Sequence, residues 1–462
     1  MTTVTARDED ADINAPPGGW AQLRFSDSTC RSAATQIVCR PDRPSRLLSA
    51  MPAPEGRSLI ARGSGQGLGD AALNDGGAVA LTVRLDRMLS FDPDEHMLVA
   101  EAGVTIGDIL RTFLPRRHMP AVYPGSLGAT LGGAIAADAH GTNHMRAGSF
   151  GDHVIWLDLI TPRGGLRRVS PQEEPALFAA TIGGMGLTGL IARAAIRMAP
   201  ITSTDVTLRR QAIGSLDMLL DQLTAGAQAH AYAAAWIDMR APGTAQERGV
   251  LETADIASGG GRAWSPARHR SRPSGGLADM LLPPRLALRV RSERQYRRAR
   301  HGRTSTMAID RFLRQHGVAP ASRLAQHGTV RLHCVLPRDG VAAAIRRLLD
   351  IARRAGGAAG AAVQAIGKDG RGMLSFARTG IALVLDLPIS VVEANLMHRL
   401  ERETLDRGGR VFLASDAHLT DHGFAAMYPR LAEFRAVLAD IDPDMRLQSD
   451  LARRLRLRDY IV

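Results

Sequence analysis

The stretch that decides the fold is residues 61–71, which read Ala-Arg-Gly-Ser-Gly-Gln-Gly-Leu-Gly-Asp-Ala. Its four glycines alternate with other residues over Gly63–Gly69, and such a backbone runs close past a ligand with its N–H groups turned toward an anion such as a pyrophosphate. The stretch is not a G-x-G-x-x-G dinucleotide fingerprint, since Leu68 stands in place of the third glycine. The apolar run at 78–85 predicts a strand, so this loop has no helix behind it and binds phosphate through its amides alone.

A second glycine-rich run lies at residues 125–133, Gly-Ser-Leu-Gly-Ala-Thr-Leu-Gly-Gly. It leads into Ala-Asp-Ala-His-Gly-Thr-Asn-His at 137–144, a segment rich in polar side chains. A single glycine loop is as easily an ordinary turn. Two of them, the second ending in a histidine cluster, predict a cofactor site.

These motifs resemble the vanillyl-alcohol oxidase / p-cresol methylhydroxylase superfamily, and within it the branch that oxidises polyprenyl-phosphate pentoses. The resembling blocks lie at 62–74, 124–153, 181–189, 426–430 and 449–455. The likeness is dense over 58–200 and 408–456 and sparse between them. It implies an α+β fold, with a two-part FAD-binding domain of the p-cresol methylhydroxylase type and a βαβ-type substrate (cap) domain.

The resemblance also implies which residues bind the FAD. They are Ala61, Arg62, Gly63, Ser64, Gly65, Gln66, Gly67, Leu68, Gly69, Asp70, Ala71, Gly125, Thr130, Leu131, Gly132, Gly133, Ala137, Asp138, Ala139, His140, Ile191 and Phe412. Members with covalently attached flavin often carry a histidine in the first loop, where this chain has Gln66. Neither loop contains a cysteine, so the FAD is expected to be non-covalent.

His140 is the principal catalytic candidate. It matches a family histidine that lies beside the flavin and the substrate, and imidazole titrates near neutral pH, as a base for a hydroxyl proton requires. A lone histidine is more often structural, and His144 and His153 are interpreted in that way. A zinc site built from His140 and His144 would need a helix, which Gly141 disfavours, and a third ligand, so no metal is expected.

The substrate side departs from the family pattern. Ser415 takes the place of a lysine, and Arg331 and His333 take the places of two glutamines of a cap strand, so these three complete the predicted catalytic set. The other departures are Leu68 for a tyrosine, Gln364 for a lysine, Ala382 for an asparagine and Val384 for a cysteine. A serine hydroxyl cannot replace an ammonium that orients a phosphate, and Arg331 and His333 are the candidates to supply the lost charge.

Composition limits the classes of protein. The formal charge is +12, but 57 of the 58 basic residues are arginine, because lysine occurs only at Lys368. This skew is typical of a GC-rich genome, and aromatic residues make up only 4%, which disfavours nucleic-acid binding. Three cysteines form no disulfide framework, no apolar run is long enough to span a bilayer, and the N-terminus is unlike a secretory signal. These features predict a cytoplasmic protein.

An arginine-rich run at 285–303 leaves two readings open. It is either a solvated loop or helix face, or a surface that contacts anionic lipid or a phosphate-bearing substrate. The second reading would make the protein membrane-peripheral.

The expected organisation is a flexible tail (1–18), the first part of the FAD-binding domain (19–200), a cap domain (201–407) and a C-terminal part that returns to the FAD domain (408–462). A Gly-, Ser-, Pro- and Arg-rich stretch at 257–305 predicts a mobile insertion in the cap. Within the cap, the order strand-helix-strand-strand-helix-strand over 331–413 is the split βαβ pattern. No internal repeat is visible.

Three functions stay open from the sequence. The first is oxidation of a secondary alcohol on a lipid-linked sugar by hydride transfer to the flavin, as half of an epimerisation completed by a separate short-chain ketoreductase. The second is a flavin oxidase or dehydrogenase for another polyol, lactone or sugar alcohol. The third is a non-catalytic FAD-binding protein.

Overall fold

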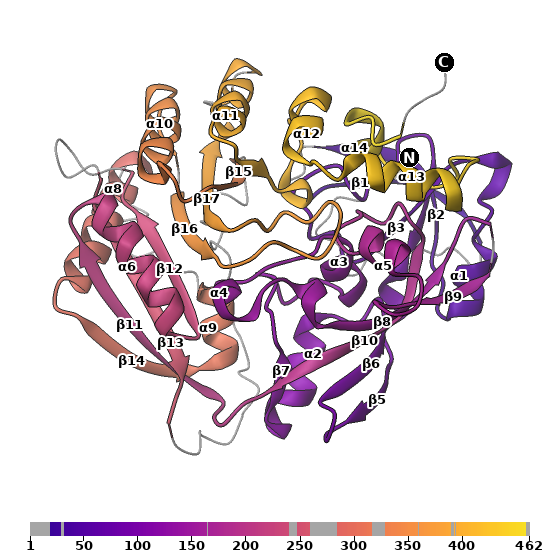
Figure 1. Cartoon of the computed structure of the whole chain (residues 1–462), viewed down its shortest axis with the longest axis horizontal. Coiled ribbons are helices and arrows are strands. Elements are labelled where there is room, and N and C mark those ends of the chain that lie inside the picture. Colours follow the sequence, from indigo (N-terminus) through magenta and orange to yellow (C-terminus); the bar gives the residue numbers. More distant parts are fainter. Residues whose placement is uncertain are drawn as a thin grey trace.

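The computed structural model describes residues 19–458 except 29–31, 164, 240–246, 259–283, 317–328, 359, 390–391 and 393. Its architecture is the predicted α+β arrangement in two halves (Figure 1). The first half lies on the right of Figure 1 and the cap on the left, and the C-terminal helices lie over the first half again. The predicted tail, 1–18, falls outside the described residues.

Two sheets build the first half. The smaller has the order β1 (Ala21–Ser26), β2 (Ala33–Cys39), β4 (Ala78–Leu81), β3 (Leu59–Arg62). The larger has the order β5 (Met88–Asp92), β6 (Met97–Glu101), β10 (Leu190–Pro200), β8 (Val154–Ile160), β9 (Leu166–Val169), with β7 (His118–Pro120) also on β10. Its helices are α1 (Pro44–Ser49), α2 (Ile106–Phe113), α3 (Leu131–Ala136), α4 (His144–Ala147) and α5 (Pro175–Thr181). Strands β3 and β4 are parallel. The first glycine loop follows β3 in the sequence and leaves the carboxyl end of that strand.

One eight-stranded sheet builds the cap. Its order is β14 (Arg303–Ala308), β11 (Asp205–Ile213), β13 (Gly249–Ile256), β12 (Tyr232–Ile237), β16 (Gly360–Ile366), β17 (Gly380–Pro388), β15 (Thr329–Leu336), β18 (Arg410–Val411). Its helices are α6 (Leu216–Ala229), α8 (Pro284–Ala299), α9 (Ile309–His316), α10 (Val341–Arg354) and α11 (Ala394–Asp406). The predicted split βαβ order is confirmed as β15–α10–β16–β17–α11–β18.

The cap is a duplicated unit, although no repeat was expected from the sequence. The element order β11–α6–β12–β13–α8–β14 repeats that of β15–α10–β16–β17–α11–β18, and each set of four strands has the spatial order second, third, first, fourth. The two units meet where β12 pairs with β16. The repeat is one of topology and register, which composition and motif spacing do not reveal.

The register makes the two units correspond residue by residue. One cross-strand row runs from His333 through β17, β16, β12 and β13 to Ala212. By the same register, the Arg331–Asp386 ion pair of one unit corresponds to an Arg210–Glu252 ion pair in the other. Position 333 is thus a histidine in one unit and an alanine in the other.

The C-terminal segment packs against the first half, as the expected two-part FAD domain requires. Its helices are α12 (Asp421–Met427), α13 (Leu431–Ile441) and α14 (Asp450–Arg454). Leu59 of β3 donates its N–H to the carbonyl of Arg446 (2.7 Å) and accepts from the N–H of Gln448 (3.1 Å). Leu447 therefore extends the smaller sheet by one parallel bridge.

Part of the predicted mobile insertion has regular structure. Residues 259–283 lie outside the described residues, whereas 284–308 form helix α8 and the edge strand β14. Strand β14 pairs with β11 along its length, which gives this segment a defined place in the sheet. Six arginines of the run are solvent-exposed among the described side chains: Arg289, Arg294, Arg297, Arg298, Arg300 and Arg303.

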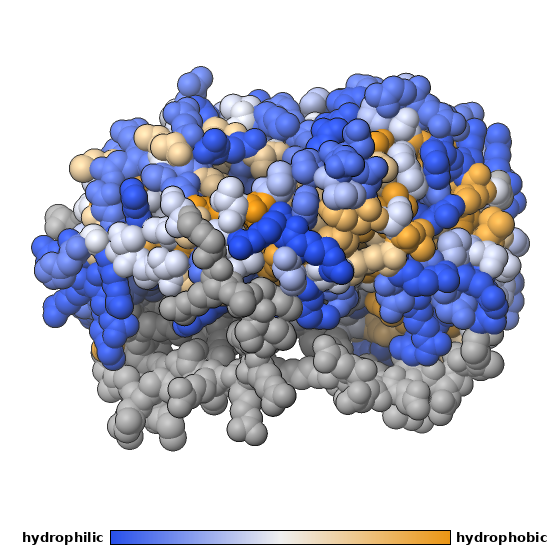
Figure 2. Space-filling model, turned by 90° about the horizontal axis from the view of Figure 1, so that it is seen from below, coloured by the Kyte–Doolittle hydropathy of each residue, from blue (hydrophilic) through white to orange (hydrophobic). Residues whose placement is uncertain are grey.

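None of the helices in the described parts of the chain is long and apolar enough to cross a bilayer. The face in Figure 2 is mostly hydrophilic, and its apolar side chains gather toward the right, on the side of the first half.

Candidate active site

The first glycine loop owes two of its glycines to close contact with the rest of the protein. A Cβ on Gly63 would overlap the hydroxyl of Thr130, and one on Gly69 would overlap the carbonyl oxygen of Asp416. Both neighbours belong to other parts of the site, the second glycine loop and the C-terminal segment. The glycines therefore allow three segments of the chain to meet.

The middle of the first loop has its amides turned away from internal partners. Leu68 donates its N–H to the carbonyl of Ala414 (3.1 Å), but the N–H groups of residues 64–67 make no hydrogen bond among the described residues. Such donors suit an anionic ligand.

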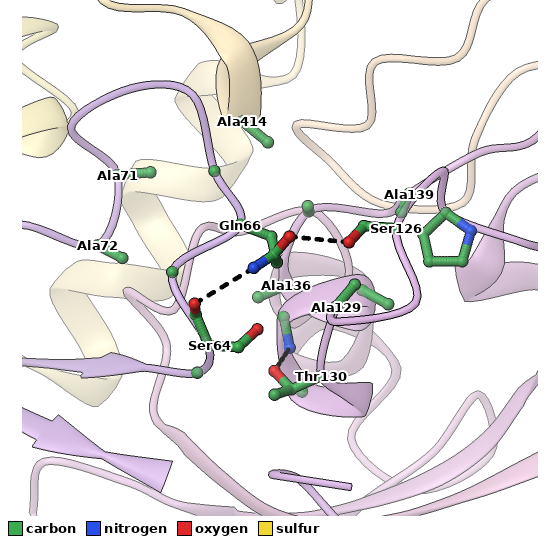
Figure 3. Close-up of a pocket in the computed structure, with 18 of the residues that line it drawn as sticks. Ser64, Gln66, Ala71, Ala72, Ser126, Ala129, Thr130, Ala136, Ala139 and Ala414 are labelled. Atoms are coloured by element: carbon green, nitrogen blue, oxygen red, sulfur yellow. Dashed lines mark hydrogen bonds between the residues drawn. The ribbon is translucent and has the colours of Figure 1, made fainter. Parts of the chain in front are cut away.

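Side chains join the two glycine loops (Figure 3). Ser64 donates its hydroxyl to the carbonyl of Gly128, and Ser126 donates its hydroxyl to Oε1 of Gln66 (2.8 Å). Thr130 caps the start of α3 by accepting the N–H of Gly133 (3.3 Å). Gln66, where members of the resembling family often carry the histidine for covalent attachment, thus bridges the two loops.

A cavity of about 660 Å³ lies between the two loops and the cap sheet. This volume is within the range of small-molecule and cofactor sites. Its lining includes predicted cofactor residues Ala61, Arg62, Gly63, Ser64, Gly65, Gln66, Gly67, Leu68, Gly69, Ala71, Gly125, Thr130, Gly132, Gly133, Ala137, Ala139, His140, Ile191 and Phe412. All four predicted catalytic residues, His140, Arg331, His333 and Ser415, also line it.

Three predicted cofactor residues do not line this cavity. Asp70 is held by a two-pronged contact with Arg454 (both distances 2.8 Å), and Leu131 lies in the hydrophobic core. Asp138 accepts the N–H of Gly151 (2.9 Å). Each of these side chains contacts other parts of the protein instead of the cavity, so each stabilises the residues that form the cavity wall.

The cavity also has lining residues that the sequence reasoning missed. They include Ala72, Ala102, Ser126, Ala129, Ala136, Met185, Gly186, Gly189, Arg314 and Ala414. The glycine-rich block at 181–189 was a usable signal for Met185, Gly186 and Gly189. Nothing in the sequence pointed to Arg314, which comes from helix α9 of the cap.

His140 is buried, with 2% of its side chain exposed. Among the residues that the structure describes, neither ring nitrogen has a hydrogen-bond partner. The ring stacks on Phe376 (centroids 5.0 Å apart) and meets Phe412 edge-on (5.3 Å). A buried polar group normally has a partner, so these nitrogens point to a ligand.

His333 of β15 lies next to His140. The ring centroids are 5.0 Å apart, and Nε2 of His333 also lacks a partner. Burial lowers the pKa of His140 to about 3 and lowers that of His333 well below its usual value; Arg331 and His140 contribute to the second shift. Both imidazoles are therefore neutral at neutral pH, so the expectation that His140 titrates near neutral pH is wrong for the cavity without a ligand, and each ring has a lone pair able to accept a hydrogen bond.

His144 differs from its neighbour at 140. Its Nδ1 accepts the N–H of Gly367 (3.3 Å) and its Nε2 lies 3.1 Å from the hydroxyl of Ser149. Both nitrogens are engaged within the protein, as the structural interpretation of His144 expects. Among the described residues, no three His, Cys, Asp or Glu side chains form a group that could hold a metal ion.

Arg331, a candidate to supply the lost charge, and Ser415, which stands in place of the lysine, are both tied to the protein. The guanidinium of Arg331 donates to both carboxylate oxygens of Asp386 (2.8 and 3.2 Å); the Arg331 side chain is 12% exposed and that of Asp386 is buried. The hydroxyl of Ser415 donates to the carbonyl of Phe412 (3.3 Å). Asp386 therefore neutralises the charge that Arg331 brings to the cavity wall.

Asp138 joins the first half to the loop between β16 and β17. It is fully buried and accepts the hydroxyl of Ser375 (2.5 Å) from that loop. Burial raises its pKa to about 6, although the hydrogen bonds from Ser375 and Gly151 act in the opposite direction. Asp138 also has a left-handed backbone (φ 43°), so this junction combines strain with a buried titratable group.

This environment predicts a pH-dependent stability. A carboxyl whose pKa is raised by folding holds its proton more tightly in the folded state, so its contribution is greatest at low pH and is lost as the pH rises through about 6. Asp138→Asn removes the charge, and its amide oxygen can still accept from Gly151 while its amide nitrogen donates to the Ser375 hydroxyl. Between about pH 4 and about pH 7 the wild type should lose at most about 3 kcal/mol of unfolding free energy relative to this variant. Denaturant titrations across that range measure the difference, and parallel curves would contradict the prediction.

These residues fit the FAD that the family resemblance implies. The amides of residues 64–67 suit a pyrophosphate, the small side chains of Ala129, Ala136 and Ala139 leave room for a flat ring system, and His140 offers unpaired nitrogens.

Comparisons with known proteins agree with this reading. The family model described as FAD binding domain matches residues 36–170. The chain is 32% identical over 416 residues to decaprenylphosphoryl-beta-D-ribose oxidase of Mycolicibacterium smegmatis, which covers 87% of this chain and 90% of that protein. An uncharacterized protein of Streptomyces coelicolor is 31% identical over 77% of this chain and 100% of its own length. Cytokinin dehydrogenase 2 of Arabidopsis thaliana is 33% identical over 33% of this chain and 30% of its own.

Proposed function

Because this chain belongs to the family of FAD-dependent oxidoreductases that includes decaprenylphosphoryl-β-D-ribose oxidase, we propose that it oxidises a secondary alcohol of a polyprenyl-phosphate pentose. The observation that carries the proposal is His140, a buried histidine with two unpartnered nitrogens on the wall of the cavity formed by both glycine loops. The product would be a keto sugar, and a separate short-chain ketoreductase would complete the inversion of that carbon.

The chain's own residues divide the work as follows. Bound FAD supplies the acceptor for the hydride that leaves the carbinol carbon. His140, kept neutral by burial, binds the hydroxyl and accepts its proton, and Phe376 and Phe412 hold its ring in place. His333 provides a second neutral imidazole beside it. The apolar surroundings keep water from competing for these nitrogens.

A second candidate is the oxidation of a neutral polyol, lactone or sugar alcohol. It is favoured by the neutralised Arg331–Asp386 pair and by the serine at position 415, since neither supplies a net positive charge for a phosphate. A lipid-linked substrate would also place the protein at the cytoplasmic face of a membrane, whereas a neutral polyol requires no such location.

Anaerobic reduction of the bound flavin distinguishes these functions. The substrates to compare are a short-chain prenylphosphoryl-β-D-ribose, the matched prenyl riboside without phosphate, free polyols and sugar lactones. We expect bleaching of the flavin absorbance by the phosphorylated pentose. Bleaching by polyols or lactones alone would favour the second candidate, and a flavin that no alcohol reduces would indicate a non-catalytic FAD-binding protein.

The flavin is expected to be released by acid precipitation. Gln66 is engaged with Ser126 and offers no nucleophile for attachment. The supernatant should contain all of the FAD, as measured by absorbance and chromatography. Yellow colour that stays with the precipitated protein would contradict non-covalent binding.

A further inference from the structure

The charges on the cavity wall are all positive. Among the described residues that line it, the ionisable side chains other than histidine are Arg62, Arg314 and Arg331, and none is a carboxylate. A wall of this kind favours ligands with negative groups. The three arginines differ in the hydrogen-bond and ion-pair partners that their guanidinium groups have within the protein.

Arg62 is committed to the fold of the first loop. It is 7% exposed, donates to the carbonyls of Ser26 (2.7 Å) and Ala72 (3.3 Å), and lies over the ring of Phe25. Arg331 is committed to Asp386, as described above. Neither guanidinium is placed to bind a further anion without losing a buried partner.

Arg314 is held differently. Among the described residues, its guanidinium has one hydrogen-bonding partner, Asp310, one turn earlier on α9, through Nη2 (2.6 Å). The side chain is 37% exposed and lines the cavity. Asp310 does not line the cavity, and the other guanidinium nitrogens remain for a ligand.

Helix α9 gives Arg314 a fixed position. Its apolar side, Ile309, Phe312 and Leu313, is buried, and the ring of Phe312 packs edge-on against Tyr232 of β12 (centroids 5.1 Å apart). The charge of Arg314 also acts on the buried phenol of Tyr123 in the first half, lowering a pKa that burial raises to about 12. Arg314 thus stands where the cap meets the flavin half.

We propose that Arg314 binds the anionic group, a phosphate ester, of the alcohol substrate and determines the specificity for phosphorylated sugars. The planar guanidinium forms two parallel hydrogen bonds with a phosphate, and such charge-assisted bonds are the strong ones. Arg314 would then supply the charge that Ser415 and the neutralised Arg331 do not. This inference rests on the proposed alcohol oxidation, because it assigns the residue that selects among its substrates.

The test uses the holoenzyme and two matched variants. Arg314→Gln removes the charge, and Arg311→Gln removes an exposed charge from the same helix that is not part of the cavity lining. Each is reduced anaerobically by the short-chain prenylphosphoryl-β-D-ribose and by the prenyl riboside without phosphate. For Arg314→Gln we expect the half-saturating concentration of the phosphorylated compound to rise about 10- to 100-fold. The limiting rate should stay within about threefold, and the riboside should be unaffected.

Two other variants complete the comparison. Arg314→Lys should recover part of the affinity, and Arg311→Gln should match the wild type. Unchanged affinity in Arg314→Gln would overturn the inference, and so would a loss of bound FAD, since that would assign Arg314 to the cofactor.

Binding of inorganic pyrophosphate to the holoenzyme, measured by calorimetry, separates the inference from the proposed function. If neither the prenylphosphoryl-β-D-ribose nor the prenyl riboside reduces the wild-type flavin, the proposed function fails. Pyrophosphate binding that Arg314→Gln weakens about tenfold or more would still support an anion-binding role for Arg314. Equal binding by both proteins, or none, would overturn it.

Discussion

His140→Ala is expected to slow reduction of the bound flavin by its substrate about 10²- to 10⁴-fold, the usual contribution of a general base. His140 has two unpartnered nitrogens on the cavity wall, and its ring is fixed between Phe376, Phe412 and His333. Alanine removes the imidazole proposed to accept the hydroxyl proton and leaves His333 as the neighbouring imidazole. The flavin should remain bound, because the loop amides and the loop-bridging side chains are untouched. Stopped-flow reduction under anaerobic conditions measures the rate.

His144→Ala is the matched control. This histidine is also buried, but its nitrogens are engaged with Ser149 and Gly367. Its loss should lower the free energy of unfolding by about 1–3 kcal/mol, because it leaves buried groups unpaired. The reduction rate of the folded protein should change by less than about threefold. A rate in His140→Ala within about threefold of the wild type would instead make His140 a structural residue.

Gly69→Ala is expected to remove nearly all of the bound FAD. The new Cβ would overlap the carbonyl oxygen of Asp416, a backbone atom that cannot turn aside. Either the first loop or the C-terminal segment must then move. Such a movement would disturb two contacts between them, the ion pair of Asp70 with Arg454 and the hydrogen bond from Leu68 to Ala414. The ratio of flavin to protein after purification should fall below about one tenth of the wild-type value, as expected when closely packed backbone is forced apart.

Gly67→Ala is the control in the same loop. A Cβ at this position would find its nearest neighbour, the carbonyl of Ala414, at 3.4 Å, which is tight but tolerable. This variant should keep its FAD. Normal flavin content in Gly69→Ala, in a folded protein, would show that the close approach of the two segments is not needed for binding.

The sequence predicts the flavin half well, because its determinants are local. Alternating glycines, the second loop and the histidine that follows are close in sequence, and all of them lie around one cavity. The β15–α10–β16–β17–α11–β18 order was also predictable, because the spacing of apolar residues within each segment distinguishes strands from helices.

Long-range side-chain pairs were beyond prediction. Arg331 was expected to lend its charge to a substrate, but its partner Asp386 lies 55 residues away and becomes a neighbour only through the register of β15 and β17. Asp70 was expected at the cofactor, but the chain returns in α14 to place Arg454 against it. Arg314 was missed because a single arginine on an amphipathic helix carries no motif.

The duplicated cap has a consequence for how this protein has changed over time. Two copies of one unit share a continuous sheet, yet only the copy with β15 carries a histidine at the cross-strand row beside His140; the other copy has Ala212 there. Selection for the reaction therefore acts directly on one copy and on the other only through its support of the shared sheet. The copy built from β11 to β14 is free to diverge in side chains while it keeps its register, and natural variation in the cap should concentrate there.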